Sequence, residues 1–438
     1  MELTHGGENT RPHDRFSFKE ALELKVLVRF TLLIGAAALF AGCGGQPTIG
    51  GPGVVPQNHI RSIVPQWQAQ HLARSACPQV VGKPTCFALQ VLKNGITPLC
   101  SPSSSCGWTA AQIETAYGLT SSLGGGSGTN VAVIEAGDLA NASSDLATYR
   151  SQYGLGTANL TKYNENGQQS NYPPSCGNYG WCLETDLDID MVSATCPKCN
   201  IFLIEAKGQI SDLEAAEATA VSVGATILSN SWGCYGSYDC GDTNFSNYFD
   251  TPGIAYLAAT GDAGYGNIAA PSVLDSVIAV GGTQLALSGS KYSETLWDGA
   301  GGGCADPSHV GGSGIPKPSW QHDPDCTYRT VADISSEAGC SPGVAVYISS
   351  YGGWTDVCGT SVASPLTAGV VALAGNATQL DAGKTFWTFK SKKHKKYFNH
   401  PTGSGYSSCG NYLCGVGRYK KYYSGPGGWG SPNGIKGY

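Results

Sequence analysis

The stretch WCLETDLDIDMVSATCP, residues 181–197, places four carboxylates on alternate positions: Glu184, Asp186, Asp188 and Asp190. Large apolar residues separate them, which is unusual for a solvent-exposed acidic run. In a helix, residues four apart lie on the same flank, so Glu184 pairs with Asp188. Asp186 pairs with Asp190 on the other flank by the same rule. Carboxyl groups held this close together are suited to general acid–base chemistry. Helical geometry alone favours neither pair.

A second stretch, DVCGTSVASPLTAGVVALAGN at residues 356–376, predicts a turn that leads into an apolar helix. Pro365 lies in the first turns of that helix, where proline is tolerated. Ser361 is then at the helix N-terminus, where free N–H groups and the helix dipole favour negative charge. That position suits a nucleophile whose attack creates an oxyanion. The alternative is that Ser361 is an N-cap without catalytic function.

Five apolar runs of strand length surround these motifs: residues 130–137, 200–206, 225–233, 254–264 and 276–283. Continuous apolar runs are typical of strands that are buried on both faces of a parallel sheet. Helix-like segments such as residues 212–224 lie between them. This alternation predicts a doubly wound α/β domain with a mostly parallel sheet and helices on both faces.

Polar residues lie at the ends of three of these predicted strands: Glu135, Trp232 and Asp262. Ligands of open parallel sheets bind beyond the carboxyl ends of the strands. Burying a carboxylate is costly unless it is paired or protonated. Glu135 and Asp262 are therefore candidate site residues.

The residues GTSVASP, 359–365, closely resemble the nucleophile motif that subtilisins and sedolisins share. A subtilisin also needs a histidine base, normally in a His-Gly-Thr motif. None of the eight histidines lies in such a motif, and the first predicted strand offers Glu135 instead of an aspartate. The serine therefore needs another base.

The residues ETDLDID and CPKCNIFLIEA resemble the signature of the sedolisin family of serine-carboxyl peptidases. The resemblance covers residues 107–438 and implies a subtilisin-like fold with a Ser-Glu-Asp triad. By this resemblance Glu184 is the general base for Ser361, and Asp188 orients Glu184. Asp186 and Asp190 are left with a solvated or structural role.

The turn AATGDAG, residues 258–264, resembles the family's oxyanion motif and implies that Asp262 replaces the oxyanion-hole asparagine of subtilisins. To donate a hydrogen bond Asp262 must be protonated, whereas Glu184 must be able to accept a proton. Their pKa values must therefore be pushed apart by the environment, which predicts an acidic pH optimum. The same resemblance implies that Glu135 and Trp232 extend the hydrogen-bond network of the triad.

The resemblance also implies a calcium site near the C-terminal end of the domain. In this chain Asn399 or His400 and Ser424 replace the acidic ligands of that site. Calcium prefers several oxygen ligands with net negative charge. The resemblance thus leaves calcium as the one candidate cofactor, and we expect its site to be degraded or lost.

The chain is poor in charge, with 13% charged residues and a net charge of −6, which gives no reason to expect nucleic acid as a partner. The Lys-rich residues 390–400 are interpreted as a solvated face. Of the 17 cysteines, 16 lie as close neighbours in the sequence. They predict the local disulfides 77/86, 100/106, 176/182, 196/199, 234/240, 304/326, 340/358 and 409/414. The pair in CPKC, 196/199, has redox or zinc binding as alternatives.

Residues 25–45, KVLVRFTLLIGAAALFAGCGG, are typical of a signal peptide, and LFAGC resembles a bacterial lipobox. The sequence therefore predicts a lipoprotein-type signal peptide at residues 1–43, with Cys43 as the lipidated residue. Residues 44–106 are interpreted as a linker with a short disulfide-pinned segment, and residues 107–438 as the peptidase domain. The family's long prodomain has no counterpart of matching length between Cys43 and residue 107, so zymogen control in its usual form is not expected.

Together these patterns predict an exported endopeptidase, either membrane-anchored through Cys43 or secreted, that cleaves proteins or peptides at acidic pH. The main alternative is an inactive surface lipoprotein that keeps the fold and acts as a binding scaffold. A histidine-dependent hydrolase is disfavoured because no histidine lies in the expected motif. The sequence predicts no oligomeric state.

Overall fold

The computed structural model describes residues 65–79, 83–98, 100, 106–236, 240–242, 244–324, 326–403, 413 and 422–438. The predicted signal peptide, Cys43 and residues 44–64 lie outside this part of the chain, so the predicted lipid anchor is not described. Within the described residues, no helix is both long and apolar enough to cross a membrane.

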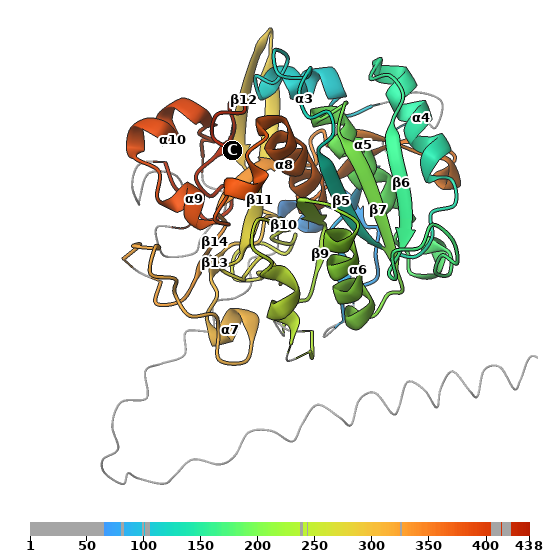
Figure 1. Ribbon diagram of the computed structural model, residues 1–438. Helices are drawn as coiled ribbons and strands as arrows, with labels where there is room; N and C mark the ends of the chain where they lie inside the picture. The colour runs from blue at the N-terminus through green and yellow to red at the C-terminus, as the bar shows by residue number, and fades with distance from the viewer. Residues whose placement is uncertain are drawn as a thin grey trace, which may run out of the picture. The chain divides into compact units, whose positions relative to one another are not determined.

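A central sheet carries most of the apolar strands, and in Figure 1 β5, β7 and β6 run side by side in it. Its strands lie in the order β12 (Lys291–Leu296), β11 (Val277–Ser288), β10 (Ala255–Ala259), β8 (Ile227–Asn230), β5 (Asn130–Ala136), β7 (Asn200–Ala206) and β6 (Asn159–Asn164). β15 (Ile334–Glu337) also pairs with β11. Apart from the antiparallel pair β11–β12, all these strands pair in parallel. The predicted mostly parallel α/β sheet is confirmed.

Two buried helices pack against each other and against this sheet, α5 (Cys182–Thr195) and α8 (Thr360–Ala374). α8 contacts β8, β10 and β11, while α5 contacts β5. Thirteen residues of α5 and fourteen of α8 are buried, so neither helix has a solvent face. This burial on all sides explains why acidic and apolar residues are interleaved in α5.

The remaining helices lie around this centre. α6 (Ile210–Ser222) packs against β5 and β7, and α4 (Ala142–Tyr153) packs against α5. α3 (Ala110–Ala116) begins with a capping box between Thr109 and Gln112. The Lys-rich segment forms α10 (Ser391–Tyr397), whose lysines are exposed, as the sequence predicts. The other short helices are α2 (Gln66–Ala69), α7 (Pro307–Val310) and α9 (Lys384–Trp387).

Residues of the predicted linker form strands of a second, antiparallel sheet. Its strands are β1 (Ala73–Ser75), β3 (Leu89–Lys93), β4 (Thr97–Pro98), β17 (Gly353–Cys358) and β16 (Val344–Ile348). β17 leads directly into α8. A separate short ladder joins β2 (Thr85–Cys86) to β9 (Trp232–Gly233). Backbone pairing therefore fixes the segment from β1 to β4 to the domain that follows it. The remaining ladders are β13 (Gly303–Cys304) with β14 (Thr330–Val331), and β18 (Phe398–Asn399) with β19 (Ser431–Pro432).

Seven of the eight predicted disulfides are present: 77/86, 100/106, 176/182, 196/199, 234/240, 304/326 and 340/358. The cysteines of CPKC are paired with each other, as the predicted local disulfide 196/199 requires. The eighth predicted pair, 409/414, lies outside the described residues. This number of disulfides is typical of a protein that folds in an oxidising, extracytoplasmic compartment.

Candidate active site

Ser361 is the second residue of α8 and is fully buried. Its Oγ donates a hydrogen bond to the backbone oxygen of Ser231 at 3.0 Å. The N-cap is Gly359, which has no side-chain capping bond, so Ser361 is not the N-cap. Gly359 has φ of 110°, and an added Cβ would lie 2.1 Å from the carbonyl oxygen of Phe87 and 2.7 Å from Oδ2 of Asp262. Glycine is therefore required at this turn.

Glu184 and Asp188 lie in the first turns of α5 and are fully buried. Oε2 of Glu184 accepts a hydrogen bond from the backbone amide of Ala88 at 2.8 Å. Burial and then the charge of Asp188 raise the pKa of Glu184, and the nearby hydroxyl of Ser361 lowers it. Oδ1 of Asp188 accepts from the hydroxyl of Ser231 at 2.8 Å. The side chains of Ser361, Glu184 and Asp188 thus lie in one cluster.

Glu135 lies near the end of β5 and joins this cluster from the sheet. Burial and the charges of Asp188 and Glu184 raise the pKa of Glu135. Burial raises the pKa of Asp188 to about 8, while the neighbouring side chains of Ser231 and Glu135 lower it.

Asp262 follows β10 and faces the start of α8. Its Oδ1 accepts hydrogen bonds from the backbone amide and the hydroxyl of Thr360, at 2.8 Å and 2.9 Å. Burial raises the pKa of Asp262 to about 8, and the two bonds from Thr360 lower it. Oδ2 has no hydrogen-bond partner among the described residues and lies beside Gly359. A proton on Oδ2 would therefore be available to a substrate oxygen.

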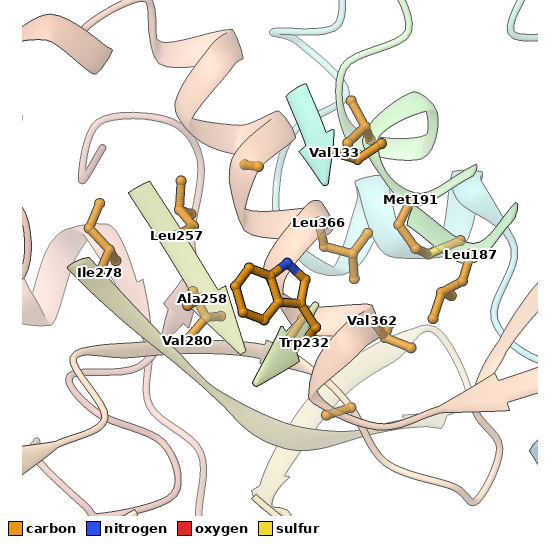
Figure 2. Packing of buried hydrophobic residues seen from close by; sticks show 14 of the residues in the cluster. Val133, Leu187, Met191, Trp232, Leu257, Ala258, Ile278, Val280, Val362 and Leu366 are labelled. Atoms are coloured by element: carbon orange, nitrogen blue, oxygen red, sulfur yellow. The ribbon is translucent and has the colours of Figure 1, made fainter. Parts of the chain in front are cut away.

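Trp232 was expected to extend the hydrogen-bond network of the triad, but its indole lies in the apolar core. Figure 2 shows its indole among aliphatic side chains of the core, near Val362 and Leu366 of α8. Its indole nitrogen has no hydrogen-bond partner within the described part of the chain. Its backbone instead pairs with Cys86 in the β2–β9 ladder. Trp232 thus packs beside the site, and no described hydrogen bond joins it to Glu135.

Asp186 and Asp190 are also fully buried, so the expectation of a solvated role is wrong. Oδ2 of Asp190 accepts a hydrogen bond from the backbone amide of Tyr347 in β16 at 3.2 Å. Burial raises the pKa of both carboxyls. Asp190 therefore has a structural position between α5 and the second sheet, whereas neither carboxyl oxygen of Asp186 has a hydrogen-bond partner among the described residues.

The sequence model of the subtilase family matches residues 156–391, which is more than half of the chain. The chain belongs to the subtilase family. Within the described part of this subtilase no histidine hydrogen-bonds to Ser361, in keeping with the carboxylates gathered there.

Curated relatives of this subtilase carry sedolisin names. Sedolisin from Pseudomonas sp. (strain 101) is 28% identical over 260 residues, covering 58% of this chain and 38% of that protein. Xanthomonalisin from Xanthomonas sp. (strain T-22) is 27% identical over 353 residues, covering 66% of this chain and 42% of that protein. The chain thus spans about two fifths of the length of these curated relatives.

Among solved structures, Pseudomonas sedolisin, a serine-carboxyl proteinase complexed with pseudo-iodotyrostatin, superposes with a TM-score of 0.59. The two are 23% identical, and the match covers 75% of this chain and 96% of that chain. This likeness shows the shared fold. With the curated relatives, it confirms the resemblance to sedolisins that the sequence indicates.

Three further residues of this subtilase contact the site and were not predicted. Ser231 bonds to both Asp188 and Ser361, Thr360 holds Asp262, and the hydroxyl of Tyr235 accepts from the backbone amide of Asp262 at 2.8 Å. Thr360 and Ser231 are each adjacent in the sequence to a predicted site residue, and this adjacency could have indicated that they contact the site. Tyr235 had no such signal, because its role depends on the loop that follows β9.

The side chains at the positions of the expected calcium site carry no carboxylate. The amide of Asn399 donates to the backbone oxygen of Pro432, and the ring of His400 stacks on Tyr422. The hydroxyl of Ser424 accepts from a backbone amide. Neutral side chains with these contacts do not fit a calcium ion, which needs several oxygen ligands with negative charge.

Proposed function

We propose that this subtilase is a serine-carboxyl endopeptidase that cleaves protein or peptide substrates. In this proposal Ser361 is the nucleophile, Glu184 the general base, and Asp188 with Glu135 orients Glu184. Asp262 stabilises the oxyanion. The observation that carries the proposal is the convergence of these five side chains, from four separate elements, at the N-terminus of α8.

The proposed reaction is acyl transfer. The hydroxyl of Ser361 now donates to the backbone of Ser231, so it must rotate to give its proton to Glu184. Oγ then attacks the peptide carbonyl, and the oxyanion is stabilised by protonated Asp262. Glu184 returns the proton to the leaving amine, and water hydrolyses the acyl-enzyme. One oxyanion-hole donor contributes about 2.7–4 kcal/mol to such a reaction.

The pH dependence follows from the protonation states of the two carboxyls. Asp262 acts only while protonated, so activity falls as the pH rises through its pKa, which burial holds at about 8. Glu184 acts only while ionised, so activity also falls as the pH drops through its pKa, which burial raises. The pKa of about 8 is that of the Asp262 carboxyl when it is fully buried. Water that enters an open cleft reduces the effect of burial, which moves both limits toward acid and supports an acidic optimum.

Export is part of the proposal. Its support is the number of disulfides and the signal-peptide pattern of residues 1–43. Lipidation of Cys43 would then anchor the domain at a membrane surface.

The test is digestion of an unstructured protein from about pH 3 to about pH 9 by the full chain and its variants. We expect Ser361→Ala to abolish digestion. Asp186→Asn is the matched control, because it changes an acid of the same helix on the flank away from Ser361. A folded, oxidised wild type that is inactive at every pH would contradict the proposal and favour the binding-scaffold alternative.

A further inference from the structure

The charges of the chain are distributed unevenly along the sequence. Residues 382–438 contain ten lysines and arginines and no aspartate or glutamate, so all 32 acidic residues lie before Ala382. A positive C-terminal region therefore follows a strongly negative remainder, although the whole chain has a net charge of only −6. Charge asymmetry of this kind within one chain indicates contact with an anionic surface.

Half of these cations lie at α10, which Figure 1 shows at the outer edge of the domain beside α9. Five lysines occupy residues 390–396, and we name them the lysine face: Lys390, Lys392, Lys393, Lys395 and Lys396. All five are exposed. Within the described part of the chain, none of the five forms an ion pair with an acidic residue. Their charges are therefore available to a partner.

The opposite flank of α10 is fixed to the domain by His394. This residue is buried, its ring stacks on that of Trp429 at 4.1 Å, and its Nε2 donates to the backbone oxygen of Phe389 at 3.0 Å. Residues three and four apart share a flank of a helix. Since His394 faces inward, Lys392, Lys395 and Lys396 together form an outward flank.

The lysine face destabilises the helix that carries it. Lys392 repels Lys395 and Lys396, because like charges three and four residues apart disfavour a helix. Lys390 is the N-cap, and the first turn contains lysines but no acidic residue. Cations at this end also oppose the helix dipole. A purely structural role does not account for this cost, whereas an anionic surface against the lysine face would relieve both effects.

Two partly exposed aromatic rings lie beside the lysine face. Nζ of Lys393 lies 4.8 Å from the centre of the Phe389 ring, and Nζ of Lys396 lies 5.7 Å from the centre of the Tyr397 ring. Aromatic rings next to lysines are typical of protein surfaces at the membrane–water interface, where the rings meet the head-group region and the cations meet phosphates. The composition of the lysine face therefore suits lipid head groups.

We propose that the lysine face binds the anionic head groups of a membrane surface. A planar surface meets this face alone, whereas a long polyanion that wraps round the domain would also meet its acidic remainder. The lysine face would act together with the lipid anchor proposed at Cys43, because one lipid chain gives only marginal attachment and a polybasic patch supplies the second signal. The proposed peptidase activity plays no part in this binding.

The test is co-sedimentation of the full chain with lipid vesicles. Cys43→Ser removes the lipidation site, so that only the protein surface can bind. We expect this parent protein to bind vesicles of phosphatidylglycerol and phosphatidylcholine in equal parts far more tightly than vesicles of phosphatidylcholine alone. Binding should weaken steeply between about 0.05 M and about 0.5 M salt, because salt shortens the range of electrostatic attraction.

Triple variants of the parent separate the lysine face from net charge. Glutamine at residues 392, 395 and 396 should weaken binding to the anionic vesicles roughly 100-fold, since each lysine near such a surface contributes about fivefold. Arginine at the same three positions should retain binding. The matched control replaces three exposed lysines elsewhere by glutamine, which changes the net charge equally and should bind like the parent: Lys83, Lys198 and Lys291. Thermal unfolding checks that each variant folds.

The outcomes distinguish this inference from the proposed function. Equal binding to both kinds of vesicle, or an equal loss of binding in the two glutamine variants, overturns the inference. Tighter binding of duplex DNA than of anionic vesicles at the same salt also overturns it, because the partner would then be another polyanion. A parent that binds anionic vesicles through the lysine face but digests no peptide upholds the inference while the proposed function fails.

Discussion

The backbone amide of Ala88 donates a 2.8 Å hydrogen bond to Oε2 of Glu184. A residue far away in the sequence, from a segment before the predicted peptidase domain, thereby supplies a donor to one oxygen of a fully buried carboxylate of α5. Charge-assisted bonds of this type favour the ionised form of the acceptor. The bond thus opposes the effect of burial, and it does so at the group that must be ionised to act as a base.

Replacing Glu184 by glutamine tests its role as the base. The amide oxygen of glutamine still accepts from the backbone of Ala88, so the fold and the peptide KM should change little. Because the amide cannot take the proton of Ser361, we expect kcat to fall by roughly 10²–10⁴-fold. Steady-state kinetics on a quenched peptide measures both constants. Unchanged kcat would assign the base to another group, and Asp186→Asn again serves as the control.

Replacing Asp262 by asparagine tests the oxyanion donor. The side-chain amide of asparagine donates without being protonated, and its oxygen keeps the bonds from Thr360. We therefore expect the fall in activity on the alkaline side of the optimum to disappear in this variant, because no group in the oxyanion hole becomes charged. Asp262→Ala should instead lose roughly 10²–10³-fold in kcat at every pH. A pH–rate profile that keeps the wild-type alkaline limit in Asp262→Asn would contradict the assignment.

Removing the hydroxyl of Thr360 should shift that alkaline limit upward. The hydroxyl donates to Oδ1 of Asp262 and lowers its pKa, so Thr360→Val, which has nearly the same shape, should raise the pKa. Thr260→Val is a suitable control, because Thr260 is also buried and its hydroxyl oxygen has no hydrogen-bond partner among the described residues. The measurement compares the alkaline limits of the pH–rate profiles of the two variants. A lower alkaline limit in Thr360→Val would contradict the hydrogen bond from Thr360 to Asp262.

The raised pKa values of the buried carboxyls predict that the folded protein is more stable in acid than at alkaline pH. Four of these carboxyls have a pKa of about 8, and burial is the largest cause of each rise: Asp188, Glu205, Asp262 and Asp356. Unfolded carboxyls titrate near pH 4, so between about pH 4 and about pH 8 the folded state binds more protons than the unfolded state. The free energy of unfolding therefore falls as the pH rises through this window.

Calorimetry of the inactive Ser361→Ala variant measures this effect without self-digestion. We expect the midpoint of thermal unfolding to be higher near pH 4 than near pH 8, by roughly 5 °C or more. A midpoint that rises with pH across the same window would show that these carboxyls are ionised in the folded protein.

Ser361, Asp262, Glu184 and Asp188 could be predicted because each lies in a short linear motif. The central strands could be predicted because they are continuous apolar runs. The complete burial of Asp186 and Asp190 could not be predicted, since α5 is covered on all sides and periodicity assumes a solvent face. The strands β1 to β4 were missed because they are short and of mixed polarity. Their pairing with β9 and β17 depends on residues that lie far away in the sequence.

The central claim is that Ser361 becomes acylated with Glu184 as its base. The most direct measurement is intact and peptide-level mass spectrometry after an acid quench of the reaction with an ester substrate. We expect one acyl group on the peptide that contains Ser361. It should form quickly in the wild type and far more slowly in Glu184→Gln. An acyl group on another residue, or turnover without any acyl-enzyme, would contradict it.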